Sequence, residues 1–190
     1  PRPDTEILVE AAVQIARRKK MRQVLDLGTG SGCILLSILD EIPEAHGVGM
    51  DISPAALKVA EDNAEALSLS SRAAFCLGSW FEEKPAFAAA FDLVVSNPPY
   101  IPHREIPALE PEVRLYDPLT ALDGGDDGYR DYRQLAKAVP GWLKPEGVLL
   151  LEVGAGQAAD VAKIFRDAGW KLLEIRRDLS GIERCVILKK

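Results

Sequence analysis

The tetrapeptide Asn97-Pro98-Pro99-Tyr100 places an amide, two prolines and a phenol directly after the apolar run 91–96. That run is typical of a buried strand, so the tetrapeptide is expected where a strand ends and a loop begins. Consecutive prolines fix φ and lack N–H groups, which makes the backbone stiff and gives its carbonyls fixed directions. An amide oxygen and a carbonyl held in this way could accept both hydrogens of a planar amino or amide nitrogen. A rigid turn without a catalytic role is the alternative that the tetrapeptide alone leaves open.

The glycine-rich segment Gly28-Thr29-Gly30-Ser31-Gly32 is the second candidate for chemistry. It lies between the apolar run 23–27 and the helical pattern 33–39, so we expect a strand–turn–helix unit. Glycines let the backbone approach a ligand closely, and the unpaired N–H groups at the start of the helix would face that ligand. The spacing therefore indicates a nucleotide-binding turn.

Two further candidates follow other predicted strands. Asp51 ends the run 46–51, 19 positions after Gly32, and a carboxylate at about this distance typically accepts hydrogen bonds from ribose hydroxyls. Asp51 could also serve the helix entry at Ser53, and the two roles are compatible. Ser79 and Trp80 follow the run 73–77. The indole of Trp80 could pack on an adenine face, or it could be a core or surface aromatic.

The elements that must position these residues alternate between strand and helix along the chain, which predicts an α/β fold. Strands are expected at 23–27, 46–51, 73–77, 91–96 and 148–153, with a closing hairpin of 171–176 and 184–188 at the sheet edge. Helices are expected to begin at Asp4 or Thr5 and to cover 33–39, 54–67, 129–143 and 157–168, with a turn at 145–147.

The segment 101–128 is long and rich in proline and acids. Loops of this length are uncommon unless they are functional or disordered. Apolar residues such as Leu109, Val113 and Leu115 argue against plain disorder. We predict that it covers a substrate, with a solvated loop as the alternative.

Composition narrows the class of protein. The 190 residues carry a formal net charge of −6, which argues against a general nucleic-acid binder because such binding depends on Lys and Arg neutralising phosphates. No apolar run approaches the length of a membrane span. Three cysteines in apolar stretches are typical of a reducing cytosol, and two histidines do not favour a metal site. We expect one cytoplasmic domain, 1–190, without metal, membrane or stable nucleic-acid binding. Because the chain begins with Pro1, we also expect a missing N-terminal part.

Asp26 stands two places before the first glycine, and the pattern D-x-G-x-G-x-G resembles the signature of S-adenosylmethionine-dependent methyltransferases. Together with N-P-P-Y it resembles enzymes that methylate planar nitrogens. Those include adenine-amino methyltransferases of DNA and RNA, and the HemK/PrmC family of protein-glutamine methyltransferases. Stretches 1–6, 78–81, 96–102 and 121–130 are similar to HemK/PrmC in particular. The last stretch discriminates best, since the adenine enzymes share N-P-P-Y without it.

The resemblance implies a Rossmann-like class I methyltransferase with a mostly parallel seven-stranded sheet, order 3-2-1-4-5-7-6, helices on both faces and an antiparallel edge hairpin. It implies methyl transfer from S-adenosyl-L-methionine, leaving S-adenosyl-L-homocysteine, to the glutamine amide of a Gly-Gly-Gln loop in peptide-chain release factors. An upstream helical domain, absent from this chain, helps to hold the release factor in that family. The implied cofactor contacts are Asp26, Gly28, Thr29, Gly30, Ser31, Gly32, Asp51, Ser79, Trp80 and Asn97. The implied substrate contacts are Asn97, Pro98, Pro99 and Tyr100.

For catalysis we assign roles to Asn97, Pro98 and Tyr100. The Asn97 side-chain oxygen and the Pro98 carbonyl would each accept one N–H of the substrate amide. Positive charge grows on that nitrogen during transfer, so fixed acceptors stabilise the transition state more than the ground state. Tyr100 would pack on the amide plane. An adenine-amino methyltransferase that flips its base and a non-catalytic S-adenosylmethionine-binding module remain alternatives at this stage.

Overall fold

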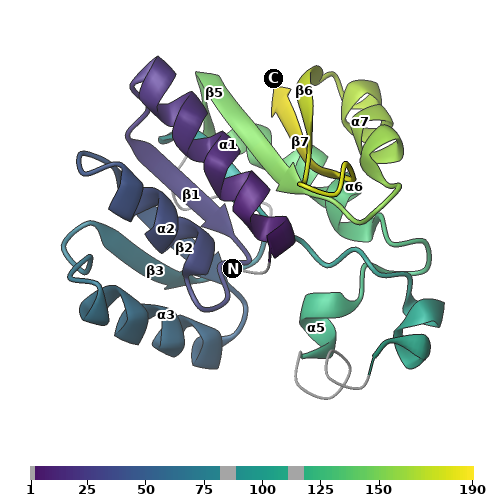
Figure 1. Cartoon of the computed structure of the whole chain (residues 1–190), viewed down its shortest axis with the longest axis horizontal. Coiled ribbons are helices and arrows are strands. Elements are labelled where there is room, and N and C mark those ends of the chain that lie inside the picture. The colour runs from purple at the N-terminus through teal and green to yellow at the C-terminus, as the bar shows by residue number, and fades with distance from the viewer. Residues whose placement is uncertain (1–2, 82–88, 111–117) are drawn as a thin grey trace.

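The computed structural model describes residues 3–81, 89–110 and 118–190. Its centre is one seven-stranded sheet of order β3-β2-β1-β4-β5-β7-β6 (Figure 1). The strands are β1 (Gln23–Leu27), β2 (His46–Asp51), β3 (Ala73–Leu77), β4 (Phe91–Ser96), β5 (Leu143–Glu152), β6 (Lys171–Arg177) and β7 (Glu183–Lys189). β7 is antiparallel to both β5 and β6, and the pairs among the other strands are parallel. The predicted strand order and edge hairpin are therefore confirmed.

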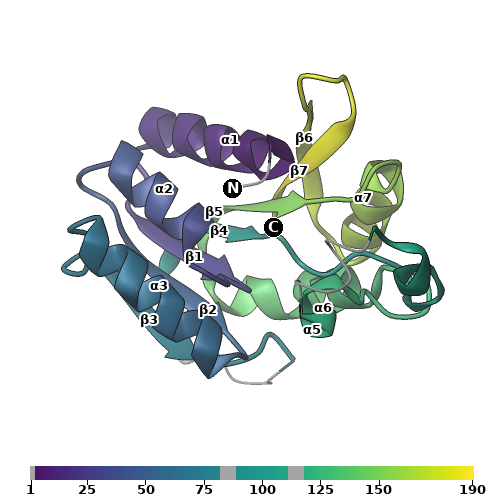
Figure 2. The same cartoon turned by 60° about the horizontal axis from the view of Figure 1, so that its bottom comes forward.

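Helices cover both faces of this sheet: α1 (Pro3–Lys19), α2 (Cys33–Glu41), α3 (Pro54–Ala66), α6 (Arg130–Ala138) and α7 (Ala158–Asp167). The short helices are α5 (Leu119–Leu122) and the 3-10 helices η1 (His103–Ala108) and η2 (Val139–Gly141), and α5 lies away from the sheet in Figure 1. Figure 2 shows α1, α2 and α3 on one face and α6 and α7 on the other. Within the described ranges, no helix combines the length and apolarity needed to cross a bilayer. Positions 1–2 and 111–117, which belong to the matched stretch 1–6 and to the predicted covering segment, lie outside the described residues.

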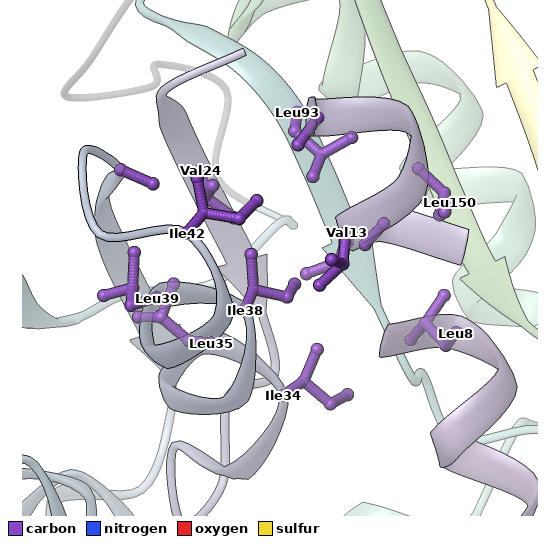
Figure 3. Close-up of a cluster of buried hydrophobic side chains, with 14 of the residues drawn as sticks. Leu8, Val13, Val24, Ile34, Leu35, Ile38, Leu39, Ile42, Leu93 and Leu150 are labelled. Atoms are coloured by element: carbon purple, nitrogen blue, oxygen red, sulfur yellow. The ribbon is translucent and has the colours of Figure 1, made fainter. Parts of the chain in front are cut away.

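Alternation along the strands builds two cores. Val24 of β1 and Leu93 of β4 face α1 and α2, where they join a buried cluster with Leu8 and Leu35 (Figure 3). The intervening residues, such as Leu25, pack in a second cluster against α6 and α7. Because successive side chains of a strand point to opposite faces, continuous apolar strands are what a sheet covered on both sides requires.

The helix predicted over 129–143 is shorter in the structure. α6 ends at Ala138 and a 3-10 turn containing Pro140 follows. Pro140 has no N–H to donate to the Ala136 carbonyl, and that carbonyl accepts the indole N–H of Trp170 at 2.9 Å instead. The prediction was wrong because it continued the helix through Pro140, and the contact from Trp170 supports the early end.

The turn predicted at 145–147 was also wrong, since these residues lie inside β5. Phe91 pairs with Leu143 and Leu93 with Val148, so residues 144–147 form a bulge in the ladder. Lys144 at the start of the bulge forms an ion pair with Asp92 at 2.8 Å. The Pro-Glu-Gly sequence interrupts pairing, as its residues indicate, but does not reverse the chain.

Four parallel strands end together at one edge of the sheet. Leu27 pairs with both Met50 and Ser96, and Asp51 pairs with Leu77. The Ser96 hydroxyl also donates to the Leu27 carbonyl at 2.7 Å. The segments that follow β1 to β4 are thereby brought to the same place, outside the carboxyl ends of the strands, where open α/β sheets bind ligands.

Candidate active site

A cavity of about 380 Å³ lies at this edge of the sheet. Its walls come from the glycine turn, the segments after β2, β3 and β4, helix α5 and the start of α6. Seven of the predicted site residues line it: Gly28, Gly30, Asp51, Ser79, Trp80, Asn97 and Pro99. Residues from four strand ends thus share one cavity whose volume is in the usual range for small-molecule sites.

The glycine turn folds back across β2. The N–H groups of Gly28 and Thr29 both donate to the Met50 carbonyl, at 2.8 and 3.0 Å. Gly28 has φ +73°, and a Cβ built there would lie 3.2 Å from the ring of Trp80. A glycine is needed here because it tolerates the left-handed conformation and lets the indole pack directly on the turn.

Asp51 ties the second strand to the turn. Its Oδ2 accepts the N–H of Gly30 at 2.8 Å and its Oδ1 accepts that of Ser53 at 2.9 Å. Ser53 in turn caps α3 by accepting the N–H of Ala56 at 3.2 Å. The helix-entry role predicted for Asp51 is present. Each carboxylate oxygen can accept a further hydrogen bond, so capacity remains for ribose hydroxyls.

Four predicted cofactor residues, in the turn or just before it, do not belong to the described lining: Asp26, Thr29, Ser31 and Gly32. The fully buried Asp26 accepts the Thr29 hydroxyl at 2.7 Å through Oδ2. Its Oδ1 has no hydrogen-bond partner within the described ranges. Burial raises the pKa of this carboxyl to about 7, against the opposing hydrogen bond from Thr29. Ser31 accepts the side chain of Asn63 through its carbonyl at 2.9 Å. These residues shape the turn, and their contact with a cofactor stays a prediction.

Within the tetrapeptide, Asn97 and Pro99 belong to the described lining of the cavity, whereas Pro98 and Tyr100 do not. Tyr100 is half-buried and packs beside the core under α6 and α7. Its carbonyl accepts the side-chain amide of Gln157 at 3.0 Å. A Cβ on Gly128, where φ is +79°, would come within 2.5 Å of the same carbonyl. The close approach of Gly128 to the tetrapeptide therefore explains why the stretch 121–130 has a glycine at this position.

Part of the predicted covering segment, residues 118–121 and Asp123, lines the cavity. Ile101 donates its N–H to Leu122 at 3.0 Å and accepts that of Gly124 at 2.9 Å. His103 continues the pairing by donating to Gly125 at 2.9 Å. α5, which precedes this pairing, contributes lining residues to the cavity.

Sequence reasoning missed Arg130 and Asp131, which both line the cavity. Asp131 is only 1% exposed. It accepts the Trp80 indole N–H at 3.1 Å and the Arg130 guanidinium at 2.9 and 3.2 Å. A signal existed, because Asp131 precedes Leu135 by one helical turn and so occupies the buried stripe of an amphipathic helix.

The family model described as "Methyltransferase domain" matches residues 18–153, so the chain is a methyltransferase domain. The sheet order and the cavity at the strand ends agree with this class. Solved structures share the fold. A ribosomal protein L11 methylase from Lactobacillus delbrueckii subsp. bulgaricus has a TM-score of 0.68 at 18% identity over 96% of this chain and 77% of that one. A SAM-dependent methyltransferase from Aquifex aeolicus has a TM-score of 0.66 at 12% identity over 97% of this chain and 92% of that one.

Curated relatives narrow the family, and three of them are named release factor glutamine methyltransferase. The protein from Rhodospirillum rubrum is 54% identical over 100% of this chain, which spans 57% of its length. The protein from Cereibacter sphaeroides is 47% identical over 98% of this chain, which spans 64% of its length. The protein from Thermodesulfovibrio yellowstonii is 40% identical over 100% of this chain, which spans 68% of its length. The chain belongs to the release factor glutamine methyltransferase family.

Proposed function

We propose that this chain binds S-adenosyl-L-methionine in the cavity and transfers the methyl group to a glutamine side-chain amide in peptide-chain release factors. One observation carries the proposal. Gly28 and Asn97 directly follow Leu27 and Ser96, which are paired in the sheet, and both line the same cavity. A cofactor-binding turn and a nitrogen-binding tetrapeptide are therefore adjacent. The names of the relatives support the glutamine of a release factor as the acceptor.

The residues of the cavity fit this cofactor. Gly28 and Gly30 bring backbone against the site, and Asp51 retains acceptor capacity for ribose hydroxyls. Ser79 and Trp80 form the wall on the other side of the turn, and the indole offers an apolar ring to an adenine. When bound, the cofactor supplies a methyl group on a positively charged sulfur, and S-adenosyl-L-homocysteine is left after transfer.

The chain's own residues then act by holding the acceptor. The Asn97 side-chain oxygen and the Pro98 carbonyl each accept one hydrogen of the glutamine amide. Asn97 is half-buried and directly follows a strand, so its position is set before the substrate arrives. Acceptors fixed in advance stabilise the positive charge that grows on the nitrogen. The half-buried ring of Tyr100 would pack against the amide plane. No carboxylate base is required before transfer, because the nitrogen becomes strongly acidic once it is alkylated and then releases one proton to water.

The test combines a labelled cofactor with purified release factor, and mass spectrometry locates the methyl group. An adenine-containing oligonucleotide forms the second arm. Transfer to the glutamine of the Gly-Gly-Gln loop alone supports the proposal. Transfer to the oligonucleotide, or cofactor binding without any transfer, would replace it with one of the alternatives.

Asn97→Ala tests the assigned chemistry. Loss of a fixed donor or acceptor at a developing charge typically costs about 10²–10³ in kcat, so turnover should fall by this factor while cofactor affinity changes less than about threefold. Asn63→Ala is the matched control, because Asn63 touches the glycine turn from outside through Ser31. It should keep kcat. Unchanged turnover in Asn97→Ala would refute the role of Asn97.

A further inference from the structure

One buried carboxylate joins three walls of the cavity. Asp131, at the start of α6, receives hydrogen bonds from Trp80 after β3 and from Arg130. Arg130 also donates to the backbone carbonyl of Asp123 at 2.7 Å. Asp123 follows α5 directly and lines the cavity. The four residues Trp80, Asp123, Arg130 and Asp131 are called the Asp131 cluster below.

The Trp80 side of the cluster faces the glycine turn. Trp80 is 9% exposed and its ring packs on Gly28. The indole has a single donor, and that donor is bonded to Asp131 at 3.1 Å. An indole that packs on glycine and hydrogen-bonds to a buried carboxylate has one orientation. The wall that a nucleobase would contact is therefore set by Asp131.

The Arg130 side of the cluster faces the covering segment. Arg130 reaches the Asp123 carbonyl through its side chain, and its backbone N–H donates to Gly124 at 3.0 Å. Gly124 pairs with Ile101, which follows the tetrapeptide directly. The guanidinium thus anchors the strand-like pairing that leads from α5 to the tetrapeptide.

A purely structural role is a weak explanation of this arrangement. Burying a carboxylate is costly unless it is paired and hydrogen-bonded, and apolar residues could fill the same space. Here each partner of the carboxylate lines the cavity. The charge is placed where it orients ligand-facing groups on both sides.

We propose that Asp131 is a positioning residue that serves both halves of the site. Its Oδ1 holds Trp80 for the cofactor, and its Oδ2, through Arg130, holds Asp123 of the covering segment for the protein substrate. This inference rests on the proposed function for the identity of the two ligands. It predicts that one side chain orients ligand-facing groups on two walls through separate oxygens, so that either contact can be removed without loss of the other.

Three variants separate the Trp80 side of the Asp131 cluster from the Arg130 side. Asp131→Asn keeps an acceptor for Trp80 but loses the charge that holds Arg130, so the KM for release factor should rise about tenfold with cofactor Kd changed less than threefold. Arg130→Met removes the guanidinium alone and should reproduce this pattern. Trp80→Phe removes the indole donor and should raise cofactor Kd with little effect on the KM for release factor. Arg177→Met, which removes an exposed ion pair with Glu183 in the edge hairpin, is the control and should change neither.

Hydrogen exchange in the protein without ligands tests the cluster apart from the proposed function. The amides of Ile101, Gly124 and Arg130 should exchange about tenfold faster in both Asp131→Asn and Arg130→Met. If exchange is faster in the variants but the wild type does not methylate release factor, the positioning role of Asp131 is supported and the proposed function is rejected. Unchanged exchange rates in both variants would refute the positioning role of Asp131, even if the enzyme methylates release factor normally. Amide exchange in the double variant, Asp131→Asn with Arg130→Met, should be no faster than in either single variant, because both changes remove the same interaction.

Discussion

Replacing Asp26 by Asn should change how the stability of the protein depends on pH. The Asp26 carboxyl is fully buried, and burial raises its pKa from 3.8 to about 7. The folded protein therefore holds a proton on Asp26 at pH values where the unfolded chain has lost it. Stability from this group is complete below the unfolded pKa and is lost as pH rises through the folded one.

The pKa difference sets the magnitude. With pKa values of 3.8 unfolded and about 7 folded, linkage gives a loss of about 2–3 kcal/mol between pH 5 and pH 8. Asn is uncharged throughout. The unfolding free energy of the wild type minus that of Asp26→Asn should therefore fall by this amount over the same interval. Urea unfolding followed by circular dichroism at four pH values measures it directly.

Asp92→Asn provides a control of opposite sign. Burial alone would raise the pKa of Asp92, but hydrogen bonds from Lys144 and from the Arg22 and Gln23 amides outweigh burial and lower it. A lowered carboxyl pKa stabilises the fold above the unfolded value and titrates well below pH 5. The unfolding free energy of the wild type minus that of Asp92→Asn should therefore be constant from pH 5 to pH 8. If the Asp26 difference is equally flat, Asp26 is ionised throughout and the burial argument fails.

Two further substitutions test the walls of the site. Gly156→Ala, with φ +82° but nothing within 4 Å of its Cβ, isolates the backbone strain and should lower the unfolding free energy by about 1–3 kcal/mol. Gly128→Ala has the same strain and a Cβ that would also meet the Tyr100 carbonyl, so it should lower the unfolding free energy further and reduce turnover. Equal effects of the two changes in chemical denaturation would show that the contact with Tyr100 is unimportant. Asp51→Asn should weaken cofactor binding about 10- to 100-fold, as expected for hydrogen bonds to a charged group; titration calorimetry that finds unchanged affinity would remove Asp51 from the cofactor site.

The parts of the fold that sequence predicted are those with local signals. The strand 23–27, the glycine turn and the following helix each depend on neighbouring residues, and all three are in place. The sheet order came from the family resemblance and is confirmed. The end of α6 was mispredicted although Pro140, inside 129–143, is a local signal that a helix stops. What the segment does not contain is the partner of the freed carbonyl, because Trp170, 34 positions away, bonds to Ala136.

The same distinction between local and distant contacts applies to the site. Residues that touch a ligand occur in short motifs, since they follow strand ends at set spacings. Residues that orient them do not. Asp131 lies 51 positions from Trp80, and Gln157 lies 57 positions from Tyr100. Their partners depend on the sheet bringing β3, α6 and α7 to one edge. A motif can therefore identify the residues that line the cavity, whereas the precision with which they are held is decided by side chains that only the folded chain brings together.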